Sequence, residues 1–423
     1  LSLFYPSPAK HQTPICPEEN SNYEADLKYT VQIARGVLNL IGVWPSSSTS
    51  STSQNLLTKL RNIFCQFLPY FIFIPGLLKM FLKESNARRR LKAVGPMCNS
   101  LLAILKYTIL TLRSNQIKEC MSFVSFDWKN VKLLNDRKIM MEYAKIGRTL
   151  AMVSVAFVYG SGLCYRTIVP LTRGTIVTNQ NITIRPLSAG FGYYIFFNPL
   201  ISPAYEIVYS IQVMAAFVQY SVLSGAVCLS ALFVLHACGQ LKILAIKLEE
   251  FQIWISDNMN IHFFRISIFL IVAIYLTLFI FLSSFLSVVE NLLQHVCLVE
   301  VLGCTLIICL LGYYIIMEWE DSDAVAIISY TTLLITFTFN LFIFCFIGEL
   351  LNDQGMKFYI KTCTLNWYRV PDKTARLLVL IIATSSTPIK ITAGKFMDLS
   401  LNSFGSIIRT SVAYLNMLRA TSI

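Results

Sequence analysis

Six long apolar runs dominate this sequence, and each is long enough to cross a lipid bilayer as a helix. An α-helix rises about 1.5 Å per residue, so about 20 apolar residues span the hydrocarbon core. The runs are Asn62–Leu82, Val94–Leu112, Ile146–Val169, Tyr205–Leu235, Leu293–Met317 and Val325–Leu350. Of the 423 residues, 55% are hydrophobic and 14% are charged, whereas soluble domains carry about 25% charged residues. A water-soluble globule is excluded, and the sequence predicts an all-α, polytopic membrane protein.

A seventh span is expected at the C-terminus in two pieces, Ala375–Thr387 and Thr392–Leu418. The segment Thr384-Ser-Ser-Thr-Pro388 separates them, because proline has no N–H to donate and restricts the residue before it. One more apolar run, Phe263–Val289, contains a single charge, Arg265. Hydropathy alone would count this run as a further span, which would move everything after it to the other side of the membrane.

The distribution of lysine and arginine predicts the orientation of the chain. Cytoplasmic loops carry an excess of these residues. With seven spans and the N-terminus in the cytoplasm, twenty Lys and Arg residues fall inside and seven outside. The glycosylation sequon at Asn181 and the acidic loop Glu318–Asp323 then both lie outside. We therefore expect a cytoplasmic N-terminus, an external C-terminus and a glycan on Asn181.

The motifs of enzymes and metal sites are missing from the sequence. The four histidines have no His partner at i+4, and there is no C-x-x-C and no nucleophile or phosphate-loop pattern. We expect no catalysis, no metal and no cofactor. The net charge of +12 follows from topology and does not indicate nucleic-acid binding. Transporter repeats with broken helices in both halves are not seen, and a rhodopsin-like receptor would have its N-terminus outside.

Short motifs along nearly the whole chain resemble those of insect odorant receptors. They are Gly42-Val-Trp-Pro45, Asp127-Trp128, His236-Ala-Cys-Gly-Gln-Leu241, Cys309-Leu-Leu-Gly-Tyr-Tyr314, Phe346-Ile-Gly-Glu349, Asn366-Trp-Tyr368, Thr392-Ala-Gly-Lys-Phe396 and Ser411–Arg419. Gustatory receptors end in a Gln-Phe pattern that is missing after Ala413-Tyr414, so the chain is similar to the ligand-tuning odorant branch and not to the shared co-receptor. The resemblance implies an odorant-gated, nonselective cation channel, in which tuning and co-receptor subunits form a hetero-tetramer.

The resemblance also implies an odorant pocket in the outer halves of the second, third, fourth and sixth spans. The candidate contacts are Leu101, Leu102, Tyr159, Leu163, Tyr209, Met214, Tyr330, Thr331 and Leu334. The three tyrosines are favoured, because a buried phenol needs a hydrogen-bond partner. Ordinary packing between helices is the alternative for each residue.

The last helix carries a polar stripe. Residues at three- or four-residue steps fall on one face, and a polar face in a spanning helix needs protein or water beside it. The stripe comprises Lys395, Asp398, Asn402, Ser406, Arg409, Ala413, Met417 and Ala420, with Phe396, Ile407, Val412 and Leu415 expected opposite. The resemblance implies that this helix lines the pore, with Met417 at a hydrophobic gate and Ala420 and Thr421 at the outer mouth. Helix packing is the alternative.

The expected organisation has four parts. They are a cytoplasmic segment 1–61, six helices with the odorant pocket 62–350, a cytosolic anchor 351–391 and the pore-lining helix 392–423. Residues 261–282 depart from the family, which has a charged cytosolic helix there. A retained intron or misjoined exon is one explanation, and an unusually apolar cytosolic helix is the other.

The expected partners are a small volatile or apolar odorant, the olfactory co-receptor and the membrane, with no nucleic acid. The resemblance implies the plasma membrane of an olfactory neuron's dendrite as the location. Two alternative functions stay open, a seven-span G-protein-coupled receptor and a homomeric gustatory-type channel.

Overall fold

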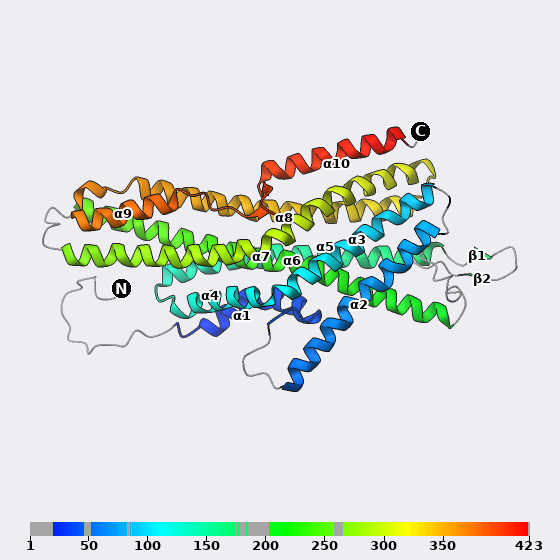
Figure 1. The fold of residues 1–423 in the computed structure, drawn as a ribbon, viewed down its shortest axis with the longest axis horizontal. Helices are drawn as coiled ribbons and strands as arrows, with labels where there is room; N and C mark the ends of the chain where they lie inside the picture. The colour runs from blue at the N-terminus through cyan, green and yellow to red at the C-terminus, as the bar shows by residue number, and fades with distance from the viewer. Residues whose placement is uncertain are drawn as a thin grey trace.

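The computed structural model describes residues 20–45, 52–82, 85, 87–173, 176–177, 183–184, 203–257 and 265–421. The fold is all-α, with two short antiparallel strand pairs (Figure 1). In chain order the elements are α1 (Tyr23–Leu40), α2 (Thr52–Leu82), α3 (Ala87–Leu112), α4 (Ser114–Asn130), α5 (Leu134–Arg173), β1 (Ile176–Val177), β2 (Thr183–Ile184), α6 (Ala204–Asp257), α7 (Arg265–Glu320), α8 (Ala324–Cys363), the 3₁₀ turn η2 (Trp367–Arg369), α9 (Asp372–Ser385), β3 (Thr392–Ala393), β4 (Met397–Asp398) and α10 (Leu401–Thr421).

Six helices in the described part of the chain are long and apolar enough to cross a membrane, namely α2, α3, α5, α6, α7 and α8. Each contains one of the six predicted apolar runs, so these predictions are confirmed at the level of helix and composition. Helices α6 and α7 have 54 and 56 residues, which corresponds to about 80 Å each. The hydrocarbon core is only about 30 Å thick, so both helices extend far beyond it. The extension lies at the end of the molecule that carries α1, α4 and α9, here called the α9 end; the opposite end carries β1 and β2 (Figure 1).

The apolar run before the fifth predicted span is not a separate crossing. Its described part, from Arg265 onward, continues without a break through α7. No proline interrupts this helix, so nothing forces the backbone to turn. Aromatic contacts hold its first third at the α9 end: Phe279 stacks on Phe358 of α8, with ring centroids 4.9 Å apart, and Phe281 lies 4.8 Å from Phe123 of α4.

Helix α6 is the centre of the bundle. Every residue from Ser224 to Gly239 is buried, as expected for a helix that is surrounded on all sides. It packs against α1, α2, α5, α7 and α8. Small residues allow close approach: a Cβ on Gly225 would lie 2.8 Å from Cδ2 of Leu38. The sequence run Tyr205–Leu235 therefore marks the core of the fold as well as a span.

Buried polar side chains cross-link the helices within the apolar segments. Lys106 of α3 and Glu300 of α7 form an ion pair with both side chains almost fully buried, and the Cys304 thiol donates to Oε1 of the same carboxylate at 3.2 Å. Ser154 of α5 donates to Oδ1 of Asn340 of α8 at 2.9 Å. Ionisable groups in hydrocarbon are costly unless paired. These pairs therefore fix which faces of α3, α5, α7 and α8 meet.

The acidic loop between α7 and α8 neutralises a basic segment at the start of α3. Lys92 Nζ lies 2.6 Å from Glu318 Oε1, and Arg88 Nη2 lies 3.2 Å from Asp321 Oδ2. Asp323 accepts a hydrogen bond from the Ala326 N–H and so caps α8. The positive charge at the start of α3 is thus partly balanced by carboxylates from the same end of the bundle.

The last helix begins later than the sequence predicted. The prediction started it at Thr392, but residues 392–398 form the β3–β4 pair, and α10 begins at Leu401. The chain reverses at Gly394 and Lys395, which both have positive φ (61° and 64°). Lys395 and Asp398 therefore do not belong to the polar stripe of the helix.

The N-terminal helix α1 is tied to α5 by one two-pronged ion pair. Nε of Arg137 donates to Oδ2 of Asp26 at 2.7 Å, and Nη2 donates to Oδ1 at 2.9 Å. Asp26 is buried. The hydrogen bonds from Arg137 hold the pKa of this carboxyl below its ordinary value of 3.8, although burial opposes the effect.

We predict that Asp26→Asn lowers the free energy of unfolding by about 1–2 kcal/mol, because charge-assisted hydrogen bonds are worth about that much when one partner is partly exposed. The folded-state pKa lies below the ordinary one, so the contribution is complete above about pH 4 and is lost as the pH falls through the folded-state pKa. Thermal unfolding in detergent at several pH values measures this. The exposed neighbour Glu24 supplies the control, Glu24→Gln, and equal loss in both variants would contradict the prediction.

Candidate functional site

A cavity lies between α3, α5, α6, α7 and α8, toward the β1–β2 end. Its volume is about 110 Å³, so it has room for more than one water molecule. The lining residues are Ile72; Lys92, Gly95, Pro96, Asn99 and Ser100; Val158, Ser161, Gly162, Tyr165 and Arg166; Gln219, Tyr220 and Leu223; Ile307, Leu310, Leu311 and Tyr314; and Tyr330, Leu333, Thr336 and Phe337.

Aromatic rings form much of the wall. The ring centroids of Tyr314 and Tyr330 are 5.4 Å apart, and those of Tyr165 and Tyr330 are 6.2 Å apart. The Tyr314 hydroxyl donates to the Leu91 carbonyl at 2.7 Å and accepts from the Gly95 N–H at 2.9 Å. This ring therefore joins the start of α3 to α7 beside the cavity.

Two glycines make room for these rings. A Cβ on Gly95 would lie 2.9 Å from the Tyr314 ring, and one on Gly162 would lie 2.2 Å from Cζ of Tyr220. Real Cβ atoms essentially never approach other atoms so closely. Any larger residue at Gly162 must therefore displace Tyr220 and change the shape of the cavity.

A chain of hydrogen bonds crosses the cavity wall between α3 and α6. Asn99 Nδ2 donates to Gln219 Oε1, and Gln219 Nε2 donates to Ser100 Oγ, each at 3.1 Å. Ser100 in turn donates to the Pro96 carbonyl at 2.9 Å. Since these polar groups satisfy one another, they add specificity to the wall at little desolvation cost.

Among the described residues, the charged groups that line the cavity are two cations, Lys92 and Arg166. Lys92 is paired with Glu318, which lies outside the lining. The Arg166 side chain lies close to the Tyr220 hydroxyl. Within the described residues there is no group of three potential metal ligands.

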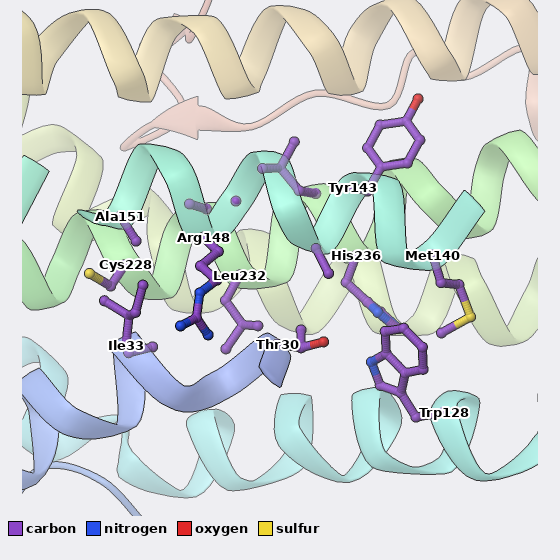
Figure 2. A pocket seen from close by; sticks show the side chains of 15 residues that line it. Thr30, Ile33, Trp128, Met140, Tyr143, Arg148, Ala151, Cys228, Leu232 and His236 are labelled. Atoms are coloured by element: carbon purple, nitrogen blue, oxygen red, sulfur yellow. The ribbon is translucent and has the colours of Figure 1, made fainter. Parts of the chain in front are cut away.

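A second, smaller hollow lies toward the α9 end between α1, α4, α5 and α6 (Figure 2). Two motifs meet there: His236 Nε2 and Asp127 Oδ2 lie 2.8 Å apart, and Trp128 lines the hollow beside His236. Its volume is about 20 Å³, which is enough for about one water molecule. This hollow is therefore a packing feature that joins α4 to α6, and the larger cavity is the candidate ligand site.

The structure also shows how the last helix is attached. The carboxylate of Glu290 of α7 accepts hydrogen bonds from the N–H and the hydroxyl of Thr392. The backbone carbonyl of Gln294 accepts one from the Gly394 N–H. Glu349 of α8 accepts from the Leu401 N–H at 3.0 Å, where a carboxylate stabilises a helix N-terminus. We call the segment 391–401 with these contacts the hinge.

Helix α10 lies outside the bundle and runs beside α7 and α8 toward the β1–β2 end (Figure 1). Ile407 and Ser411 are buried, and Leu415 packs on Gly312 of α7. The other predicted apolar-face residues, Phe396 and Val412, are exposed.

The helical members of the predicted polar stripe all share the exposed face: Asn402, Ser406, Arg409, Ala413, Met417 and Ala420. The side chain of Thr421 and the sequon Asn181 lie outside the described part of the structure. A single chain thus leaves one face of α10 without cover from its own helices.

The comparisons with known proteins agree with this geometry. The family model described as 7tm Odorant receptor matches residues 87–412. The chain belongs to this odorant receptor family. Odorant receptor 10 of Aedes albopictus is 22% identical over 320 residues, which cover 75% of this chain and 80% of that protein. Putative odorant receptor 92a of Drosophila melanogaster is 26% identical over 133 residues, 31% of this chain and 32% of the relative.

Solved structures share the fold of this odorant receptor. The insect olfactory receptor OR5 from Machilis hrabei in complex with eugenol superposes with a TM-score of 0.74 at 13% identity, over 95% of this chain and 100% of the other. The structure of the same receptor reported without that ligand gives 0.73. The protein is a multi-pass membrane receptor and not an enzyme.

Of the nine residues predicted to contact the odorant, Tyr330 lines the cavity of this receptor. Tyr159 lies just behind the wall, where its hydroxyl is 2.6 Å from that of Ser221 and its ring is 5.8 Å from Tyr220. Leu102 fills the space beside Gly303, and Tyr209 stacks on Tyr205 near the start of α6.

The remaining five predicted contacts are also outside the lining. Leu101, Leu163 and Met214 are exposed on the outside of the bundle, and Thr331 and Leu334 are half-buried beside Tyr330 on α8. Neighbours in sequence point in different directions on a helix, so a residue in a helix that lines this cavity need not face it.

The sequence prediction missed Lys92, Asn99, Arg166 and Gln219. A usable signal was present, since the lining residues of α3 recur at positions 92, 95, 96 and 99, and those of α5 at 158, 161, 162 and 165. This spacing marks one helix face. Polar residues on such a face within an apolar span are the feature that points to a cavity.

Filling the cavity tests its role. We predict that Leu223→Trp, which adds bulk on the cavity wall, lowers sensitivity at least about tenfold for odorants that activate the unmodified receptor, because overpacking costs about 1–3 kcal/mol. Dose–response curves with surface expression measured in parallel provide the readout. Leu101→Trp, at an exposed position on α3, should leave the curves in place. If Leu101→Trp lowered sensitivity and Leu223→Trp did not, the odorant site would lie on the exposed face of α3 and not in the cavity.

Proposed function

We propose that this receptor is the tuning subunit of an odorant-gated, nonselective cation channel formed with the olfactory co-receptor in a plasma membrane. The observation that carries the proposal is that one helix links the cavity to the segment before α10. Helix α7 lines the cavity with Ile307, Leu310, Leu311 and Tyr314, and the same helix holds the hinge of α10 through Glu290 and Gln294.

The link passes through rigid elements only. From Tyr314 to Glu290, α7 is continuous helix, so a displacement at the cavity is transmitted to the hinge with little loss. The Lys106–Glu300 pair holds α7 against α3 between these two points. A ligand shifts the closed–open equilibrium only if it binds one state better. Since α3 and α7 both line the cavity, an odorant that prefers one arrangement of these helices biases the hinge.

The exposed face of α10 supports a place at the pore. Six residues of the predicted stripe lie on it, and the three polar ones, Asn402, Ser406 and Arg409, would be costly against lipid. Met417 is the largest apolar member of this stripe and is 66% exposed. In an assembly around an axis, such side chains form a ring that closes a pore by excluding water.

The orientation follows from the loop charges. With the α9 end in the cytoplasm, most Lys- and Arg-rich segments lie inside, with the start of α3 as the exception, and the cavity lies in the outer half of the membrane. The cavity can then take an odorant from outside. The Machilis hrabei receptor of the same fold, solved in complex with eugenol, supports a small organic ligand for this chain.

An exposed apolar stripe on α7 supports contact with a second subunit. Ile266, Leu270, Ile274 and Leu278 recur every four residues and are exposed, so they form one face. Contiguous exposed apolar patches mark interaction surfaces. We assign this face, at the α9 end, to the neighbouring co-receptor subunit.

The central experiment distinguishes a channel from a G-protein-coupled receptor. Odorant-evoked current in an excised patch that contains this receptor and the co-receptor, without nucleotide in the bath, is the expected result. A current that disappears on excision and returns with GTP would overturn the channel proposal.

A gate variant tests the role of α10. We predict that Met417→Ser, which makes the ring polar, raises basal current several-fold when the receptor is paired with the co-receptor, because a wetted constriction no longer closes the pore. Recordings without odorant measure this. Met356→Ser, at an exposed methionine of α8, is the control, and unchanged leak in Met417→Ser would remove this residue from the gate.

A charged variant tests the subunit contact. Ile274→Lys should reduce recovery of the co-receptor on affinity purification at least about tenfold, since an unpaired charge in an apolar interface costs several kcal/mol. Ser283→Lys, at an exposed polar position of the same helix, is the control. If Ile274→Lys instead lowers the yield of the chain expressed alone, lipid covers this face and the assignment is wrong.

A further inference from the structure

The cavity is chemically different at its two ends. Toward the β1–β2 end it is lined by Lys92 and Arg166, at the start of α3 and late in α5. About two turns further along the helices, toward the α9 end, it is lined by Val158, Ile307 and Phe337. A ligand that fits both ends has one polar head and one apolar tail.

The polar end favours a negative head. Among the residues that the structure describes, both charged members of the lining are cations, and the lining includes no Asp or Glu. The carboxylate that balances Lys92 belongs to Glu318, which is buried behind the wall. The Tyr220 hydroxyl lies against the Arg166 guanidinium and adds a neutral hydrogen-bonding group at the same end. An ammonium head would be repelled here, whereas a carboxylate would meet charge-assisted donors in a partly desolvated site.

The polar side chains in the middle of the cavity are not expected to bind the polar head of a ligand. Asn99, Gln219 and Ser100 are hydrogen-bonded to one another and to the Pro96 carbonyl. Breaking that network to bind a ligand would leave buried polar groups unpaired. The strongest donors for a ligand are therefore the two cationic side chains.

From this arrangement we infer that the cavity accepts an aliphatic monocarboxylate, with its carboxylate at Arg166 and Lys92 and its chain against Val158, Leu223 and Phe337. The inference rests on the proposed function in so far as this cavity is the odorant site. It adds the chemical class of the ligand. Glu318 competes with the ligand for Lys92, so the receptor tunes its own affinity for acids.

Two variants shift acid binding in opposite directions. Arg166→Gln removes a cation and should weaken hexanoate about tenfold or more, as expected when a hydrogen bond to a charged group is lost. Glu318→Gln keeps the shape of the side chain but releases Lys92 from its carboxylate, and should strengthen hexanoate several-fold. 1-Hexanol has the same chain without the charge, and its response should change less than twofold in either variant.

The measurement has two independent readouts. Purified receptor is tested for thermal stabilisation by hexanoate and by 1-hexanol, because a ligand that binds the folded state raises the unfolding temperature. Receptor and co-receptor together are tested for current with the same pair of compounds. Met214→Gln, at an exposed position of α6 outside the cavity, is the matched control for an uncharged glutamine substitution.

The outcomes separate the two proposals. Stabilisation by hexanoate that falls in Arg166→Gln and rises in Glu318→Gln supports the inference, with or without current. The same stabilisation without any current counts against the channel function alone. Current with 1-hexanol but no stabilisation by hexanoate, equal shifts for both compounds, or no stabilisation of any variant overturns the carboxylate inference.

Discussion

The requirement that backbone hydrogen bonds be satisfied without water controls this structure. In hydrocarbon, each segment that crosses must close its N–H and C=O groups within itself, which leaves helices as the available form for single chains of this kind. Backbone bonding therefore explains why the spans are helices but not how they pack. The packing is decided by the few polar side chains that need partners. Lys106 forms an ion pair with Glu300, and Ser154 forms a hydrogen bond with Asn340. Each pair brings two particular helix faces together.

These contacts place the candidate ligand site and the hinge on one helix. Helix α7 carries four cavity residues toward one end, and farther along toward the α9 end it carries the carboxylate and carbonyl that hold the strand pair before α10. The motif Phe346-Ile-Gly-Glu349 has a specific task in this arrangement. Gly348 lets the Leu399 carbonyl approach to where a Cβ would clash at 2.4 Å, and Glu349 accepts from the first N–H of α10. The hinge is thus held by contacts with both α7 and α8.

Much of the fold was predictable, because the hydropathy of a segment depends only on its own residues. The six spans were located from apolar runs, and each lies within one of the long helices. The break before the last helix was also predicted from Pro388, although the β3–β4 turn at Gly394 and Lys395 delays the helix to Leu401. The cavity was harder to predict. Tyr330 lines it, whereas Leu101 and Met214 are in spans that contribute to it but on their exposed faces.

The sequence by itself determined an all-helical membrane receptor of the odorant family, because the number, length and order of apolar segments and motifs are written along the chain. Only the tertiary structure decided which residues meet. It joined Lys92 to Glu318 across more than two hundred residues and aligned Phe263–Val289 with the next span as one helix from Arg265 onward. The reason is that the sequence of a helix lists the residues of all its faces. Which face becomes buried depends on neighbouring helices that are far away along the chain.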